Sequence, residues 1–367
     1  MKSKTFTPLK NQTVSTCIDP GTLKRTDIDC TEEYLTEVII AIALTPGFLN
    51  QIRLSYYSME LAGFLDGSLR INVIYSGCER KDLFTKDEHN ADISESAQTN
   101  FDKFQQWAKN QKHIRLLKVP EDFIKTQYPT PFAHCNFRFH IPLSNTCKAV
   151  ILCDADTVFL KKFNPVNLIA EHDGPAVAGH MVHYPPPYTQ DGIVTKVTEQ
   201  LWADIFDQLK LPISAIKHNC SIGGREHGLQ PPNFNFGFVV VNPKMYYLLS
   251  MNFNRYRKTI TETLKTPMSG QISVMAIGLE NQAQFTLLPA SYNAANDSLH
   301  WEKNNLNEES IFVLHYLREH EFLREEFLND QHLEGFLAGE SMVKGTQLLR
   351  NRVKVVREKF GSAIFSS

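Results

Sequence analysis

The sequence predicts an α/β protein with a mostly parallel central sheet, flanked by helices, and an acid pair at the end of one strand. Between residues 37 and 119, apolar β-branched segments alternate with segments of helical periodicity. The apolar segment Ala149–Cys153 then runs directly into Asp154-Ala155-Asp156. Later apolar segments, at 236–242 and 311–315, also border polar residues that can bind ligands.

The first part of the predicted sheet is a β-α-β-α-β unit. Its strands are expected at 37–44, 70–75 and 114–119, and its helices at 48–65 and 94–110. Thr45-Pro46-Gly47 ends the first strand, and Asp66-Gly67 ends the first helix. Such alternation predicts parallel strands joined by right-handed crossovers. Neither GxGxxG nor GxxxxGK occurs, so we expect no dinucleotide fingerprint and no P-loop.

The acid pair follows a strand with no polar residue before Asp154. In extended backbone, residues i and i+2 point to the same side, so Asp154 and Asp156 converge around the small Ala155. Two carboxylates at the end of a buried strand repel each other unless a cation lies between them. Hard oxygen ligands suit Mn²⁺ or Mg²⁺. The alternative is an ordinary turn or helix cap, but the buried strand before the pair and the apolar Val158–Leu160 after it favour a metal site.

The second part of the chain is less regular. Strands are expected at 176–179, 236–242, 284–288 and 311–315, and helices at 194–209, 245–264, 271–279 and over most of 318–360. We expect a polar lead-in at 1–33 and one domain at 34–320, with a nucleotide-binding half (34–156) and an acceptor-binding half (157–320). A helical extension at 321–367 would follow.

Composition excludes some classes of function. The chain has 367 residues, 38 basic against 40 acidic, and a formal charge of −2, which argues against nucleic acid as a partner. Its seven cysteines are scattered without a CxxC pair, which favours a reducing compartment. The first 27 residues are polar and lack an apolar signal region, so we expect a cytoplasmic protein.

Four further residues are candidates for the site. His315 ends a predicted strand and could supply an imidazole nitrogen to the metal; the alternative is a structural histidine. Arg138 could bind a diphosphate through its guanidinium; the alternative is a surface arginine or a salt bridge. Asn235, expected just before the strand at 236–242, can hydrogen-bond hydroxyls, and Gly237 allows close backbone approach; the alternative is a turn.

The order of these motifs resembles nucleotide-sugar glycosyltransferases of the GT-A fold. The motifs are Arg-x-x-x-Pro at 138–142, Asp-x-Asp at 154–156, Asn-x-Gly at 235–237 with Asn-Pro at 242–243, Gln271, and the strand that ends in His315. They are most similar to glycosyltransferase family 8, which includes glycogenins and bacterial lipopolysaccharide glycosyltransferases. The resemblance spans about residues 37 to 320.

The resemblance implies a role for each residue. Asp154, Asp156 and His315 would bind Mn²⁺ (or Mg²⁺), with Ala155 between the acids also in the donor site. Thr45 would lie near the nucleotide base, and Arg138 and Gly237 would contact the donor. Asn235, Gln271 and Asp154 would lie at the reaction centre. The implied partners are a nucleotide-sugar donor, a UDP-sugar in this family, and a glycan, lipid-linked or protein acceptor, with retention of anomeric configuration.

The chain departs from the family after the histidine. The family usually has Gly-x-x-Lys-Pro-Trp there, whereas this chain has Tyr316-Leu317-Arg318-Glu319-His320-Glu321, so we expect Arg318 to replace the lysine. Gly270 stands where the family often has an acid. These departures keep a catalytically degenerate nucleotide-sugar-binding protein as an alternative.

The strongest enzymatic rival is a haloacid-dehalogenase-like phosphatase, since Asp154-Ala-Asp156-Thr157-Val158 also resembles its signature. That family has its motif near the domain start and a later Asp-Asp or Gly-Asp-x-x-x-Asp. Here neither later motif occurs, and a β-α-β-α-β unit precedes the pair.

The C-terminal segment 344–359 is predicted to be a basic amphipathic helix. Its basic residues and its apolar stripe are Lys344, Arg350, Arg352, Lys354, Arg357 and Lys359, and Leu349, Val353, Val356 and Phe360. Such a helix either lies weakly on an anionic membrane or packs its stripe on the domain. The second arrangement is the commoner one.

Overall fold

The structure is a computed structural model that describes residues 33–75, 96–120, 123, 133–169, 173–182, 188–190, 193–195, 198–222, 225–264, 269–316, 324–362 and 364–365. The strands are β1 Thr36–Ile42, β2 Leu69–Tyr75, β3 Ile114–Lys118, β4 Ala149–Cys153, β5 Thr157–Phe159, β6 Ala176–Met181, β7 Tyr188–Gln190, β8 Ile193–Thr195, β9 His218–Ile222, β10 Arg225–Gln230, β11 Phe234–Val241, β12 Gln284–Leu287, β13 Ala294–Ala295 and β14 Val313–His315. The α-helices are α1 Pro46–Leu61, α3 Ser96–Lys109, α5 Thr198–Leu209, α6 Pro243–Leu264, α7 Ser269–Glu280, α8 Ser298–Lys303, α9 Asp330–Ala338 and α10 Lys344–Phe360.

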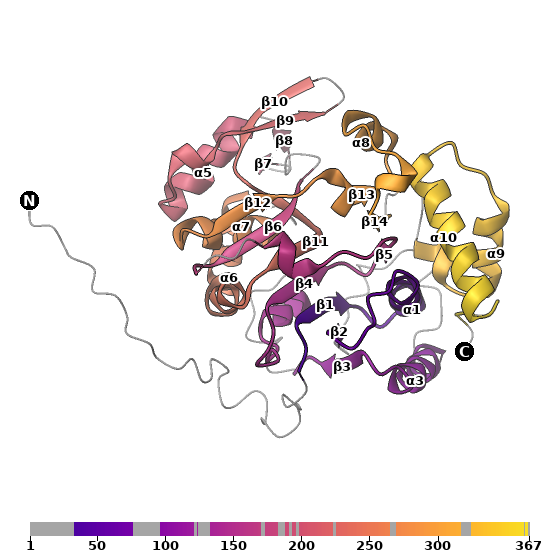
Figure 1. Ribbon diagram of the computed structural model, residues 1–367. Helices are drawn as coiled ribbons and strands as arrows, with labels where there is room; N and C mark the ends of the chain where they lie inside the picture. Colours follow the sequence, from indigo (N-terminus) through magenta and orange to yellow (C-terminus); the bar gives the residue numbers. More distant parts are fainter. Residues whose placement is uncertain are drawn as a thin grey trace, which may run out of the picture.

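A seven-stranded sheet in the order β12-β6-β11-β4-β1-β2-β3 forms the centre of the molecule (Figure 1). The pairs β1–β2, β1–β4, β2–β3 and β6–β12 are parallel, and only β11 runs antiparallel to its neighbours β4 and β6. The α/β class predicted from the sequence, with a mostly parallel sheet flanked by helices and the acid pair at a strand end, is confirmed. The strands β1 and β4, which come before residue 156, and the strands β6 and β11, which come after it, belong to the same sheet.

Apolar side chains cover both faces of this sheet. On one face, residues of α5, α6 and α7 pack with alternate residues of β4, β6 and β11. On the other face, residues of α1 and α3 pack against the other set of alternate strand residues. Burial on both faces explains why β1 and β4 are apolar at almost every position rather than at every second one.

A smaller sheet, β13-β14-β5, joins the C-terminal helices to the central sheet. A third core lies beneath it and includes the apolar stripe of α10: Leu349, Val353 and Val356 are all fully buried. The packing alternative therefore describes this helix, and a contact of its basic face with a membrane stays a prediction. The partly buried guanidinium of Arg352 donates to the carbonyl oxygens of Ser58 (2.8 Å) and Phe159 (2.7 Å), which connects α10 to α1 and β5.

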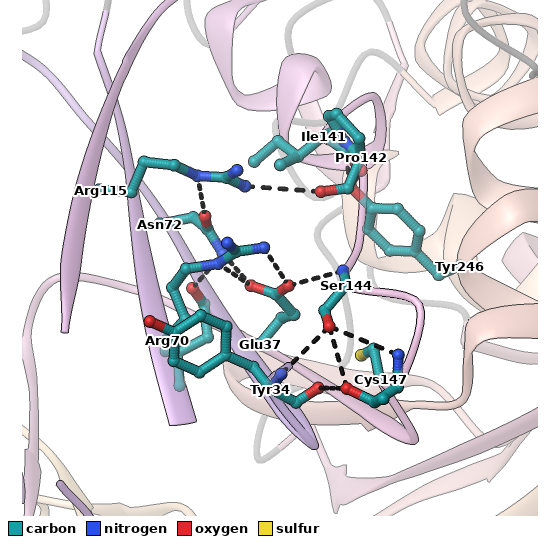
Figure 2. A network of polar contacts seen from close by, with 12 residues as sticks. Tyr34, Glu37, Arg70, Asn72, Arg115, Ile141, Pro142, Ser144, Cys147 and Tyr246 are labelled. Carbon is teal, nitrogen blue, oxygen red and sulfur yellow. Dashed lines mark hydrogen bonds and ion pairs between the residues drawn. The ribbon is translucent and has the colours of Figure 1, made fainter. Parts of the chain in front are cut away.

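A buried polar network lies at the amino ends of β1 and β2, at the edge of the sheet opposite the acid pair (Figure 2). The carboxylate of Glu37, which is 0% exposed, accepts from Arg70 Nη2 at 2.6 Å and from Arg70 Nε at 3.0 Å. It also accepts from Asn72 Nδ2 at 2.7 Å and from the main-chain N–H of Ser144 at 2.9 Å. Because Ser144 lies just before β4, the network fixes the segment that leads into the strand of the acid pair.

Two expectations about the second half were wrong. The helix expected from 194 begins at Thr198, and residues 193–195 form strand β8, as the β-branched Ile-Val-Thr favours. The strand expected from 236 begins at Phe234, so Asn235 lies inside β11 rather than before it. An irregularity in the pairing of β11 with β6 lets the strand hold this polar residue: four residues of β11 separate Phe234 from Val239, whereas one residue of β6 separates their partners.

Candidate active site

The candidate site forms at one edge of the central sheet. The parallel strands β1 and β4 both end there, so Thr45 and Asp154 follow at the same edge. Because β11 is antiparallel to β4, its beginning lies at that edge as well, and the pair Phe238–Cys153 places Gly237 beside Asp154. Topology alone therefore brings together residues that are far apart in the sequence.

Asp154, Asp156 and His315 form a cluster whose ligand atoms all lie within 4.8 Å of one another. Strand pairing produces it: β14 is antiparallel to β5, and His315 is paired with Thr157, the residue after the acid pair. His315 Nε2 lies 3.3 Å from Asp156 Oδ1, and the N–H of Tyr316 donates to the carbonyl oxygen of Asp156 at 3.0 Å. The three residues predicted as metal ligands thus lie close to one point.

The cluster has one open side. The side chain of Asp154 is 38% exposed, whereas those of Asp156 and His315 are 11% and 18% exposed. Two of the three groups are therefore held inside the protein, and Asp154 faces outward, where a ligand can approach. The acid pair is fixed by Thr157, whose hydroxyl donates to the carbonyl oxygen of Asp154 at 2.9 Å.

Gly237 supports the cluster through the space that it leaves. A Cβ at this position would lie 2.1 Å from Nδ1 and 2.6 Å from Cγ of the His315 ring. No side chain therefore fits between β11 and the imidazole. The glycine is required because the ring lies directly on the backbone, with Nε2 turned toward Asp156.

Asn235 lies two residues before Gly237, in the irregular part of β11. Its Oδ1 accepts from the N–H of Gly237 at 2.8 Å and from Nδ2 of Asn293 at 3.1 Å. Asn293 was not predicted from the sequence. It lies in a loop just before the short strand β13, and nothing in the surrounding Ser-Tyr-Asn-Ala-Ala marks it as part of a site.

Arg138 brings positive charge to the cluster from a 3₁₀ helix, Ala133–Phe139. Its Nη1 lies 3.9 Å from Asp154 Oδ1, and its Cζ lies 5.5 Å from the centre of the Phe236 ring. Tyr246 fixes the helix, since its hydroxyl donates to the carbonyl oxygen of Arg138 at 2.8 Å and accepts from the N–H of Ile141 at 3.0 Å. Tyr246 is a second residue that the sequence did not single out.

The other predicted residues lie at or near this edge. Thr45 is almost fully buried and precedes α1, and Ala155 is buried between the two acids. Gln271 is half-buried in the first turn of α7, next to Gly270, where a Cβ would lie 3.4 Å from the Phe236 ring. The roles of Thr45, Ala155 and Gln271 stay predictions. Arg318 lies outside the described residues.

The thiol nearest to the cluster is not poised to react. Cys153 is the last residue of β4 and is fully buried. Burial, and to a smaller extent the neighbouring negative charge of Asp154, raises its pKa to about 12. The thiol therefore stays protonated at neutral pH. The groups of the site that can bind a metal or a charged ligand are the carboxylates, the imidazole and the guanidinium.

No helix in the described part of the chain has both the length and the apolar character that crossing a bilayer requires.

Comparisons with known proteins gave structural matches only. No protein-family model matches the sequence, and no curated protein matches it. The solved structures that resemble it include the bifunctional glycosyltransferase WbbM in its apo form, with 12% identity over 78% of this chain and a TM-score of 0.48. The chain covers 46% of WbbM.

Two further matches cover more of the other protein. The galactosyltransferase LgtC, in complex with donor and acceptor sugar analogs, has 12% identity and a TM-score of 0.45, with 83% of this chain and 98% of LgtC covered. The mannosyltransferase PcManGT from Pyrobaculum calidifontis, in complex with GDP-Man and Mn²⁺, has 11% identity and a TM-score of 0.38, with 90% and 72% covered. What this chain does is decided by the residues of its own site.

Proposed function

We propose that this protein is a metal-dependent glycosyltransferase of the GT-A type, which moves a sugar from a nucleoside-diphosphate donor to a hydroxyl group of an acceptor. The observation that supports it is the convergence of Asp154, Asp156 and His315 at the edge of the sheet where open α/β proteins bind ligands. Following the sequence resemblance, the donor is a UDP-sugar, the acceptor is a glycan, a lipid-linked sugar or a protein, and the anomeric configuration is retained.

The residues of the cluster fit a divalent metal ion. Oxygen and nitrogen ligands lie about 2.0–2.6 Å from such ions, so two ligands of one ion are at most about 5 Å apart. The cluster meets this limit at 4.8 Å, and the 3.3 Å between His315 Nε2 and Asp156 Oδ1 suits two adjacent ligands. Two carboxylates and one imidazole suit Mn²⁺ and leave coordination positions for water and phosphate oxygens. When bound, the ion supplies Lewis-acid neutralisation of charge on the departing nucleoside diphosphate.

The protein side chains have complementary tasks. Asp154 faces outward and is the ligand that can reach both the ion and the donor. The Arg138 guanidinium, 3.9 Å from Asp154, adds positive charge at the side where a diphosphate carries negative charge. In this proposal Asn235 and Gln271 act at the sugar end of the donor, where their amide groups would hydrogen-bond hydroxyls.

The decisive experiment measures donor binding to the full-length chain. Calorimetry with UDP-glucose, UDP-galactose, UDP-N-acetylglucosamine and GDP-mannose, with and without Mn²⁺, should show binding that depends on the metal. Asp156→Ala should abolish this dependence, because it removes the most buried carboxylate of the cluster. Asp207→Ala, at an exposed position on α5, is the matched control and should bind as the natural protein does.

Other outcomes point to other functions. Unaltered metal-dependent binding by Asp156→Ala would refute the site. Hydrolysis of p-nitrophenyl phosphate without any nucleotide-sugar binding would identify the phosphatase instead. Slow release of UDP or GDP supports a transferase, whereas binding without turnover in the presence of acceptor sugars would show a degenerate binding protein.

A further inference from the structure

Asn235 uses one end of its side-chain amide entirely within the protein. Its Oδ1 accepts the N–H of Gly237 at 2.8 Å and Nδ2 of Asn293 at 3.1 Å, so both lone pairs of this oxygen are occupied. Its Nδ2 makes no hydrogen bond with any other described residue. The amide is therefore oriented, with its oxygen turned inward and two N–H donors left for a ligand.

Asn293 is placed to impose this orientation. It is 3% exposed, and its Nδ2 donates both to Oδ1 and to the main-chain oxygen of Asn235, each at 3.1 Å. Its own N–H donates to the carbonyl oxygen of Ala290 at 3.0 Å, and the ring of its neighbour Tyr292 is stacked on Phe312 at 4.5 Å. The loop that carries Asn293 is thus anchored in the core, and the asparagine enters the site from a fixed backbone.

The orientation of the Asn235 amide matters because this residue lies close to the metal cluster. The N–H that it accepts belongs to Gly237, whose Cα faces the His315 ring of the metal cluster. If the amide turned over, two N–H groups would oppose the donors of Gly237 and Asn293. The bonds from both partners therefore favour a single rotamer, with an N–H group presented to an oxygen atom of whatever binds beside the cluster.

We propose that Asn293 is a positioning residue, which holds Asn235 so that its amide donates to an oxygen of the sugar in a nucleoside-diphosphate sugar. This inference rests on the function proposed above. Asn293 itself does not touch the sugar, and its effect is carried entirely by Asn235. An N–H group that is oriented before the ligand binds loses less conformational entropy on binding.

The alternative is a purely structural role, in which the two asparagines only join β11 to the loop before β13. Both roles predict a loss of stability when Asn293 is replaced, so stability does not separate them. The two roles differ in which affinity changes. A structural link would affect the affinities for UDP and for a UDP-sugar alike, whereas a positioning residue would affect only the part of the affinity that the sugar adds.

The test is a double-mutant cycle measured by calorimetry at saturating Mn²⁺, with UDP and with the tightest-binding sugar nucleotide of the panel. Asn293→Leu keeps the size of the side chain and removes its hydrogen bonds. It should weaken sugar-nucleotide binding about 5- to 10-fold, the equivalent of one hydrogen bond, and leave UDP and Mn²⁺ affinities unchanged. In an Asn235→Ala background, Asn293→Leu should have no further effect.

Three results would overturn the inference. The first is an unchanged sugar-nucleotide affinity for Asn293→Leu, the second is an equal loss for UDP and for the sugar nucleotide, and the third is a loss that persists in the Asn235→Ala background. All three leave the proposed function standing, since the natural protein still binds the donor. If the natural protein binds no sugar nucleotide at all, the proposed function fails, and this inference fails with it.

Discussion

Replacing Gly237 by alanine should disable the metal cluster with little change elsewhere. The added Cβ would lie 2.1 Å from Nδ1, 2.6 Å from Cε1 and 2.6 Å from Cγ of His315, whereas ordinary contacts are at 3.4–4 Å. The ring therefore has to move by roughly 1 Å or more, and its three close atoms belong to the body of the imidazole rather than to a flexible tip.

The size of the effect follows from metal geometry. Ligand distances in functional metal sites vary by only about 0.2 Å, so a displacement of about 1 Å removes His315 Nε2 from its place beside Asp156. Disturbing a group that merely orients a ligand already costs about 10–100-fold in metal affinity. We therefore expect Gly237→Ala to weaken Mn²⁺ binding at least about 100-fold, as much as His315→Ala does.

The assay is calorimetric titration of the full-length protein with Mn²⁺, together with thermal unfolding. Gly335→Ala is the matched control: it adds the same methyl group to helix α9, where a Cβ would meet nothing within 4 Å. The control should bind Mn²⁺ normally and unfold at the same or a higher temperature. If Gly237→Ala folds and binds Mn²⁺ with the affinity of the natural protein, His315 is not a ligand of this site.

Three further predictions concern stability and its pH dependence. Glu37→Gln should lower the free energy of unfolding in urea by about 3–5 kcal/mol, because the buried Arg70 loses the carboxylate that holds it; a loss below about 1 kcal/mol would contradict this. Burial lowers the pKa of His140 to about 4, so the unfolded chain takes up a proton near pH 6.5 and the folded chain does not. Stability should therefore fall by up to about 3 kcal/mol as the pH drops from 6.5 to 4, and His140→Phe should show a smaller fall over the same range. Arg352→Met removes two hydrogen bonds to main-chain carbonyl oxygens. It should lower the free energy of unfolding by about 2–4 kcal/mol and weaken Mn²⁺ binding. Lys354→Met, at an exposed position of the same helix, should change neither.

The strands of the first half could be predicted because their signal is local. The segments at 37–44 and 70–75 are apolar and β-branched, and the structure has strands at Thr36–Ile42 and Leu69–Tyr75. The second half was harder, because short elements carry little periodicity. The helix predicted at 194–209 wrongly included residues 194 and 195, although the three β-branched residues at 193–195 form a strand.

The candidate site divides in the same way. Asp154 and Asp156 could be found because their spacing and the apolar strand before them both lie within a few consecutive residues. Asn293 and Tyr246 could not be found, because each acts through one hydrogen-bond partner that is distant in sequence. An asparagine in a loop and a tyrosine in a helix carry no local mark of such a partner.

The α/β class, the acid pair and the residues that could bind a metal were all predictable from the order of the amino acids. That His315 lies against Asp156 depends on β14 pairing with β5 in one register, which no local pattern in the sequence predicts. The role of Gly237 also differs from the prediction. From the sequence we expected it to allow the backbone to approach a ligand, whereas in the structure it lies against the His315 ring. The physical reason is that residue type and spacing set local conformation, whereas contacts between distant strands are set by the packing of the whole chain.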